Sequence, residues 1–418
     1  MSLAVLGGEP VRTRPFPLWP DYDGNEEAEL LRVLRSRSWG GYDPSVQKLE
    51  SSFAELHQVP HAVSCVNGTV ALEVALRAVG IGPGDEVIVS PFTFIASATA
   101  ILLCQGSPVF ADIDPQTLNL TPAAAEAAIT PRTRAIVVVH FGGHPAEMDA
   151  FQQLARRHKL ALIEDAAHAH GASWNGVPVG GWGDAATFSF QAFKLMTAGE
   201  GGMILTRSPE VAEFCWSYCN QGRRRDGGWF EHVRLGTNYR MTGFQAAVLV
   251  AQLSRLSHQT EVRAANVSYF RKRLRDYPCF KLAEDDPRVG GHPHYLVTLR
   301  YDPEECSGVP RDLAISALQA EGIPAKPTYP YPLYRNPLFR KDGELLARYQ
   351  DWSAAQEYET LALPEAERVC RDGIWLSHTV FLGGPKDVDD ILLAIEKLHR
   401  HASSLLEVKG AARELKEG

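Results

Sequence analysis

The residue best suited to covalent chemistry in this sequence is Lys194, in the stretch "FSFQAFKLMTAGEGG" that runs from Phe188 to Gly202. Lys194 lies five residues after Ser189, among mostly apolar residues. A glycine cluster that is incompatible with a regular helix follows it. Most lysines in such a setting extend their charged end to solvent from the edge of a buried segment. A lysine that is kept partly dry has a lowered pKa and can form a Schiff base with a carbonyl group. The stretch alone allows both interpretations.

A candidate partner for a cationic group follows in "LALIEDAAHAHG", where a predicted buried strand ends with Glu164 and Asp165. A carboxylate at that place is costly to keep charged unless a cation faces it. The protonated ring nitrogen of pyridoxal 5'-phosphate (PLP) is such a cation, and enzymes that use PLP keep its ring cationic with a carboxylate. The alternative is that Asp165 caps the helix after the strand. This segment also leaves both interpretations open.

A phosphate site is suggested by "CVNGTVALEVAL", which has the pattern of a strand, a glycine turn and a helix. The backbone amides of Gly68 and Thr69 open that helix, where unpaired donors and the helix dipole favour a phosphate. Many strand-to-helix turns share this pattern, so it is a weak signal. Ser189 could add a hydroxyl group, and Phe94 could lie over a flat ring, although an aromatic residue there is more often part of the core.

The elements that must position these residues are short apolar runs that alternate with helical patterns through the first 210 or so residues. The runs are "HAVSCV", "DEVIVS", "PVFADI", "RAIVVVH", "LALIED", "AATFSF" and "GGMILT". Such continuous runs predict strands that are buried on both faces, and the helices between them predict crossover connections. We therefore expect an α/β fold whose large domain contains a mostly parallel seven-stranded sheet. Ligands of open sheets bind beyond the carboxyl ends of the strands, where the residues above lie.

A long helical pattern from Thr242 to Asp276 predicts a connector between domains, since it contains no proline and no glycine after Gly243. Beyond it, "HYLVTLRY", "PRDLAISALQAEG" and "KDVDDILLAIEKLHRHASSL" predict a smaller C-terminal α+β domain. We assign an N-terminal arm and the large cofactor-binding domain to residues 1–255. We assign residues 256–418 to the end of the connecting helix and the small domain.

Composition excludes several classes of protein. The 418 residues carry a formal net charge of −8, whereas a nucleic-acid binder would carry a clustered basic charge. The run Arg223-Arg224-Arg225 is the one conspicuous basic patch, and such a run is more often a solvated surface than a contact with an anion or a partner. The apolar run from Phe94 to Cys104 is too short to span a bilayer, and the seven cysteines form no zinc pattern. We predict no metal, no membrane partner and, without a signal-peptide pattern, a cytoplasmic location.

The order of these features along the chain identifies a protein family more specifically than any single feature does. A glycine turn opens the first helix, an Asp-x-x-His follows a strand in mid-domain, and Ser-x-x-x-x-Lys, backed by "GEGG", begins 24 residues after Asp165. Together they resemble the PLP-dependent sugar aminotransferases of fold type I, the DegT/StrS type. The similarity runs from "WPDYDGNEEAELLRVLRS" to "LSHTVFLGGP" and includes "LGTNYRMTGFQAAVL".

This resemblance implies a role for each matching position. Lys194 would form the Schiff base with PLP, Asp165 would pair with the pyridine nitrogen, and Ser189 would bind the phosphate. His168 would lie beside the ring oxygen, where relatives often have Gln. Asn238 in "GTNYR" would reach the phosphate of the neighbouring subunit's cofactor, so that a homodimer shares its active sites.

Within the family, "DAAHAHGASWNGVPVG", "KLMTAGEGG" and "VRLGTNYRMTGFQAAVL" are most similar to glutamine:scyllo-inosose aminotransferases and to amino-hydroxybenzoate synthase. The resemblance implies transfer of an amino group from L-glutamine or L-glutamate to a keto-cyclitol or keto-sugar in secondary metabolism. The alternatives are an aminotransferase for nucleotide-linked keto-sugars, a dehydratase that forms an amino-hydroxybenzoate, and a degenerate PLP-binding regulator without turnover. The presence of Lys194, Asp165 and Ser189 weighs against the last.

Overall fold

The computed structural model describes residues 2–340 and 357–407. Its largest element is a seven-stranded sheet in which every predicted apolar run forms a strand, so the expected fold class is confirmed. The strands, in their order across the sheet, are β1 (His61–Cys65), β9 (Gly202–Thr206), β8 (Ala185–Ser189), β5 (Ala161–Asp165), β4 (Thr133–Val139), β2 (Glu86–Val89) and β3 (Ser107–Phe110).

Most neighbouring strands of this sheet are parallel. The pairs β5–β8, β4–β5, β2–β4 and β2–β3 are parallel, whereas β9 is antiparallel to both β1 and β8. No helix lies between β8 and β9, and two strands joined without a crossover helix pair antiparallel. The connection between them, residues 190–201, carries Lys194.

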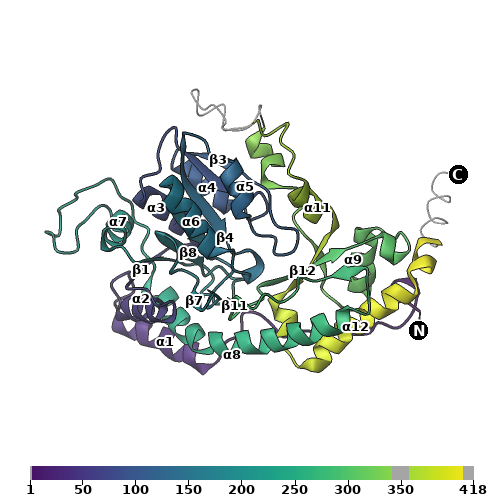
Figure 1. Ribbon diagram of the computed structural model, residues 1–418. Helices are drawn as coiled ribbons and strands as arrows, with labels where there is room; N and C mark the ends of the chain where they lie inside the picture. Colours follow the sequence, from purple (N-terminus) through teal and green to yellow (C-terminus); the bar gives the residue numbers. More distant parts are fainter. Residues whose placement is uncertain (1, 341–356, 408–418) are drawn as a thin grey trace.

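Helices cover both faces of the sheet and make a three-layered large domain (Figure 1). One face packs against α3 (Gly68–Ala78), α4 (Ala96–Leu103) and α7 (Pro209–Cys219). The other face packs against α2 (Pro44–Leu56) and α8 (Gly243–Leu274) at one end, and against α5 (Pro122–Ala127) and α6 (Met148–His158) at the other. Burial on both faces explains why the strands are continuous apolar runs.

The long helix α8 packs against elements of both the large and the small domain. A capping box between Thr242 and Gln245 fixes its start. Its first half packs against α1 (Gly24–Ser36) and α2, and its second half contributes Val267, Phe270 and Leu274 to the core of the small domain. The expected boundary at residue 255 therefore falls inside one continuous helix, which crosses the lower part of Figure 1.

The small domain contains an antiparallel four-stranded sheet. Its strands, in their order across the sheet, are β10 (Phe280–Lys281), β12 (Leu296–Tyr301), β14 (Gly373–Ser377) and β13 (Lys326–Pro327). One face packs with α9 (Arg311–Ala320) and α12 (Pro385–Arg400) in the core, and α11 (Pro364–Asp372) lies on the side of the large domain. A third sheet joins β11 (Val289–Gly290), β6 (Ser173–Trp174) and β7 (Val177–Pro178). Short 3₁₀ helices complete the described elements: η1 (Ala4–Leu6), η2 (Phe141–Gly143), η3 (Glu304–Cys306), η4 (Leu333–Arg335), η5 (Pro337–Phe339) and η6 (His378–Phe381).

The first residues of the chain pack against the small domain, although we grouped them with the large one by their place in the sequence. Leu3 lies fully buried in the core that α9 and α12 share, and the N-terminus lies beside that domain in Figure 1. Glu321 accepts hydrogen bonds from the backbone of Ala4 and from Lys397, at 2.8 and 2.6 Å. Arg12 is ion-paired with Asp387 at 2.6 Å. The contacts of Ala4 with Glu321 and of Arg12 with Asp387 join residues more than 300 positions apart, which sequence patterns do not reveal.

Candidate active site

A pocket of about 610 Å³ lies at the edge of the large sheet where β1, β5 and β8 end. Ligands of open α/β sheets bind at this edge. Of the eight candidate site residues, seven line the pocket: Gly68, Thr69, Phe94, Asp165, His168, Ser189 and Lys194. The fold therefore brings together four separate segments of the chain. Asn238 does not line the pocket of its own chain.

Asp165 is fixed at the end of β5 by two hydrogen bonds. Its side chain is buried, the hydroxyl of Ser97 donates to Oδ2 at 2.7 Å, and the backbone amide of Ala167 donates to Oδ1 at 3.2 Å. The second bond closes a turn and caps no helix, because residues 166–172 form turns that lead to β6. Because the carboxylate also lines the pocket, it stabilises the turn and remains available to a cation there.

The neighbouring acid, Glu164, points away from this pocket into the protein. Its carboxylate accepts hydrogen bonds from the backbone amides of Gly180, Trp182 and Gly183 at 2.8 to 3.0 Å. His140 Nε2 lies 3.2 Å from it. Burial raises the pKa of Glu164, but the contact with His140 and the amide donors outweigh burial and lower it overall. Of the two adjacent acids, Glu164 holds the strand-to-loop structure and Asp165 is the one exposed to the pocket.

Lys194 lies half-buried in the wall of the pocket. Burial lowers the pKa of its amine from 10.5 to about 8, while the carboxylate of Asp165 acts in the opposite direction. The Nζ atom lies 4.7 Å from the centre of the Tyr295 ring, whose face attracts a cation. An amine with a pKa of about 8 is neutral far more often at neutral pH than an ordinary lysine, as a nucleophile requires.

His168 presents an unpaired polar atom in the same region. Its ring is buried and stacks on Tyr295, with 4.3 Å between the centroids and 26° between the planes. Burial, and then the charge of Lys194, hold the pKa of His168 well below its usual value, so the ring is neutral. Its Nδ1 atom has no hydrogen-bond partner within residues 2–340 and 357–407. A buried unpaired nitrogen beside a pocket is available to a ligand.

The start of α3 forms a cradle for an anion. Asn67 caps the helix by accepting from the amide of Val70 at 2.9 Å, which leaves the amides of Gly68 and Thr69 for a ligand. A Cβ atom on Gly68 would lie 2.7 Å from Ser189 Cβ and 3.1 Å from Ser189 Oγ. Only glycine allows this approach, which brings the Ser189 hydroxyl beside the helix N-terminus. The residues present therefore fit a phosphate group.

Phe94 and Asn238 are both exposed in the single chain. Phe94 is 57% exposed and lines the pocket, which argues against the interpretation that it is core. Asn238 is also exposed, and its backbone pairs with Asn220 in an isolated bridge. It is free to face another chain.

Several pocket residues were missed by the sequence interpretation, namely Ser97, Tyr295, Tyr329 and Trp375. Ser97 had a detectable signal, since it lies in the first turn of a helix that follows a strand end and a candidate ring-stacking residue. The other three belong to the small domain. Nothing in their local sequence shows that they face the large one.

Other chemistry is not indicated by the described part of the chain. Within it, no three or more His, Cys, Asp or Glu side chains are arranged to hold a metal ion. No helix of the described ranges is long and apolar enough to cross a bilayer. All seven cysteines are buried and free.

Within an α/β fold, one pocket thus holds a lysine amine of lowered pKa, a buried carboxylate and a helix N-terminus that fits an anion. The chain belongs to the DegT/DnrJ/EryC1/StrS aminotransferase family, whose model matches residues 20–396. It is therefore an aminotransferase by family, as its motifs predicted.

Comparison with individual proteins shows which members of the family this chain is similar to. The chain is 40% identical over 416 residues to a protein of Streptoalloteichus tenebrarius that is provisionally named L-glutamine:3-amino-2,3-dideoxy-scyllo-inosose aminotransferase, covering 97% of this chain and 99% of that one. It is 37% identical to L-glutamine:2-deoxy-scyllo-inosose aminotransferase of Streptomyces fradiae, covering 96% and 99%. The crystal structure of 3-amino-5-hydroxybenzoic acid synthase is 35% identical with a TM-score of 0.83, covering 93% and 100%. Both predicted similarities within the family are confirmed.

Proposed function

We propose that this protein is a PLP-dependent aminotransferase that moves an amino group from L-glutamine or L-glutamate to a keto-cyclitol. The observation that carries the proposal is the grouping of a lysine of lowered pKa, a buried carboxylate and a helix N-terminus around one pocket. Bound there, PLP would supply an aldehyde that exchanges amines and a ring that accepts electrons. The names of the relatives support a carbocyclic ketone as acceptor and L-glutamine as donor.

The pocket offers a residue for each part of PLP. The amides of Gly68 and Thr69, with the hydroxyl of Ser189, would hold the phosphate, and Phe94 would lie over the ring. The carboxylate of Asp165 would keep a proton on the ring nitrogen, and Ser97 holds that carboxylate in place. The unpaired nitrogen of His168 would lie near the ring oxygen.

Lys194 would have two tasks. Its amine would bind the aldehyde carbon in the resting enzyme. After an amino donor displaces it, the free Nζ would take a proton from the donor and return it, which general base catalysis requires of a group with a pKa near the working pH. A pKa of about 8 suits both tasks.

A homodimer with shared sites would complete the pocket. Between the paired residues Asn220 and Asn238 the chain presents Trp229, Phe230 and Leu235, which are 78%, 78% and 88% exposed. The rings of Trp229 and Phe230 lie 5.7 Å apart, centroid to centroid, and large exposed apolar side chains that cluster in this way indicate a protein interface. The exposed Asn238 at the end of this loop would then reach the phosphate in the partner's site.

The test has two parts: chemical trapping of the bond between Lys194 and PLP, and a comparison of candidate amino acceptors. Borohydride reduction of the PLP-loaded protein should add the mass of the cofactor to the peptide that contains Lys194, and L-glutamine should change the visible spectrum. Lys194→Ala is the control and should lose both signals. The amino-loaded enzyme is then offered 2-deoxy-scyllo-inosose, a nucleotide-linked keto-sugar and an aminobenzoate precursor ketone. Faster turnover of either of the last two would reject the keto-cyclitol acceptor, and a spectrum unchanged by amino donors would reject an enzyme.

A further inference from the structure

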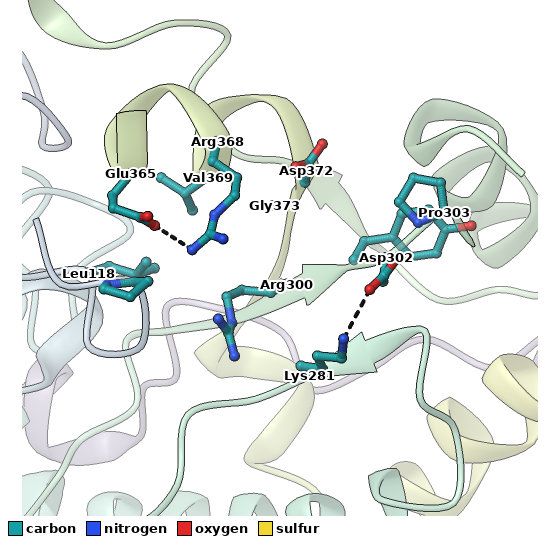
Figure 2. A pocket seen from close by; sticks show the side chains of 12 residues that line it. Leu118, Lys281, Arg300, Asp302, Pro303, Glu365, Arg368, Val369, Asp372 and Gly373 are labelled. Atoms are coloured by element: carbon teal, nitrogen blue, oxygen red, sulfur yellow. Dashed lines mark hydrogen bonds and ion pairs between the residues drawn. The ribbon is translucent and has the colours of Figure 1, made fainter. Parts of the chain in front are cut away.

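A second, smaller cavity of about 210 Å³ lies between the two domains (Figure 2). Its walls are the small-domain strands β10, β12 and β14, the helix α11, and Pro115 with Leu118 from the large domain. It shares no lining residue with the aminotransferase pocket. The first residue of β12, Leu296, lines the aminotransferase pocket, whereas Arg300 near its other end lines this cavity, about 13 Å further along the strand.

The charged residues around this cavity are paired with one exception. Lys281 donates to Asp302 at 2.9 Å, and Arg368 pairs with Glu365 within α11, as the dashed lines of Figure 2 show. Asp372 pairs with the neighbouring Arg371 at 2.7 Å. Each carboxylate of the wall thus has its own cation. The guanidinium of Arg300 is left with no ion pair or hydrogen bond to the described chain.

An unpaired guanidinium is unfavourable at the position that Arg300 takes in the sheet. The register of the sheet places it directly opposite Lys281 on one side and Gly373 on the other. Two like charges on directly opposed strand residues repel each other. In addition, Arg300 Nε is shielded from solvent and has no acceptor in the part of the chain that the structure describes. A shielded donor without an acceptor is costly, and an anion bound to the guanidinium from the cavity would give Arg300 the partner that the described chain does not supply.

We propose that Arg300 anchors a binding site for a small oxyanion, a carboxylate or a phosphate, in this cavity between the domains. The planar guanidinium matches the two oxygens of such a group through parallel hydrogen bonds. Lys281 and Arg368 line the same space, but each is paired with a carboxylate of the wall, so Arg300 carries the unpaired positive charge that an anion would meet. The cavity is below the range of about 300 to 1,000 Å³ typical of sites for drug-sized ligands, so the ligand is a small anion rather than a nucleotide.

The site is tested by calorimetric titration of the PLP-loaded enzyme, whose cofactor phosphate already fills the cradle at α3. The probes are inorganic phosphate and succinate at constant ionic strength, with chloride as the blank. Saturable binding is expected for at least one probe, and the stronger probe identifies the anion as phosphate-like or carboxylate-like. Arg300→Met should weaken it at least tenfold. The matched control Arg157→Met, a surface arginine paired with Glu126 at 2.7 Å, should bind as wild type.

Two results would overturn the proposal: heats no larger than those of chloride, or saturable binding that Arg300→Met leaves unchanged, which would place the anion in the aminotransferase pocket. If Arg300→Met lowers the melting temperature of the unliganded enzyme so far that it does not fold, Lys281→Met replaces it. That variant should bind the same probe at least threefold more weakly, and wild-type affinity would also reject the site.

Discussion

The titration of Lys194 in the cofactor-free enzyme tests the central physical claim about the active site. Burial lowers the pKa of its amine from 10.5 to about 8. The neutral fraction at pH 7 is then about 300 times that of an ordinary lysine, since 10 to the power (10.5 − 8) is about 300. We therefore expect Lys194 to react with a small amine reagent at neutral pH, where surface lysines are almost fully protonated.

The assay is competitive labelling with trace acetic anhydride from pH 6 to pH 11, followed by mass spectrometry of the peptide that contains Lys194. The midpoint of its labelling curve should lie near pH 8 in the folded protein. In the denatured protein it should move to about 10.4, the value for an exposed lysine. The exposed Lys159 provides an internal reference on the same molecule. Loading with PLP should protect Lys194 and leave Lys159 unaffected.

The direction in which Asp165 shifts the pKa of Lys194 provides a second test. Its carboxylate stabilises the protonated amine and raises the pKa of Lys194, against burial. Asp165→Asn should therefore move the midpoint of Lys194 further below 8. A midpoint for the folded wild type that equals the denatured value, or a rise in the Asp165→Asn variant, would refute the reasoning.

Other substitutions test the remaining parts of the site. Asp165→Asn should still bind PLP, but single-turnover rates should fall by at least about 100-fold, equivalent to about 2.7 kcal/mol; rates near wild type would remove Asp165 from the mechanism. Ser97→Ala deletes a hydrogen bond to an ionised group worth roughly 1.5 to 3 kcal/mol, so rates should fall about 10- to 150-fold while Ser97→Thr retains most activity. Equal rates for both Ser97 variants would show that Asp165 needs no such support. Lys194→Met should raise the melting temperature of the cofactor-free protein at pH 7, because the lowered pKa of Lys194 means that its protonated amine destabilises the fold. The gain in melting temperature should shrink as the pH rises from 8 to 10.5, where the amine becomes neutral in both the folded and the unfolded chain. A gain that persists at pH 10.5 would contradict the lowered pKa of Lys194. Co-expressed Asn238→Ala and Lys194→Ala chains should recover up to about half of wild-type activity per heterodimer, since one site would carry both lesions and the other neither; purified heterodimers without recovery would reject shared sites.

The sequence by itself determined the large domain and most of the pocket. Strands buried on both faces must be continuous apolar runs, so seven such runs predicted seven strands. The residues at the carboxyl ends of the parallel strands then had to meet at one edge of the sheet. This is why Asp165, Ser189 and the opening of α3 could be placed near one another before any coordinates. The family motif added Lys194, whose long connection between strands has no regular pattern.

Only the tertiary structure decided which of two adjacent acids faces the pocket. Glu164 and Asp165 are equivalent in the sequence, but alternate residues of a strand point to opposite faces, and Glu164 meets three amides and His140. The same holds for Tyr295, which stacks on His168, and for Arg300, which has no partner in the described chain. Their roles depend on the approach of the small domain to the large one. That approach is fixed by packing between residues far apart in the chain, and local patterns carry no information about it.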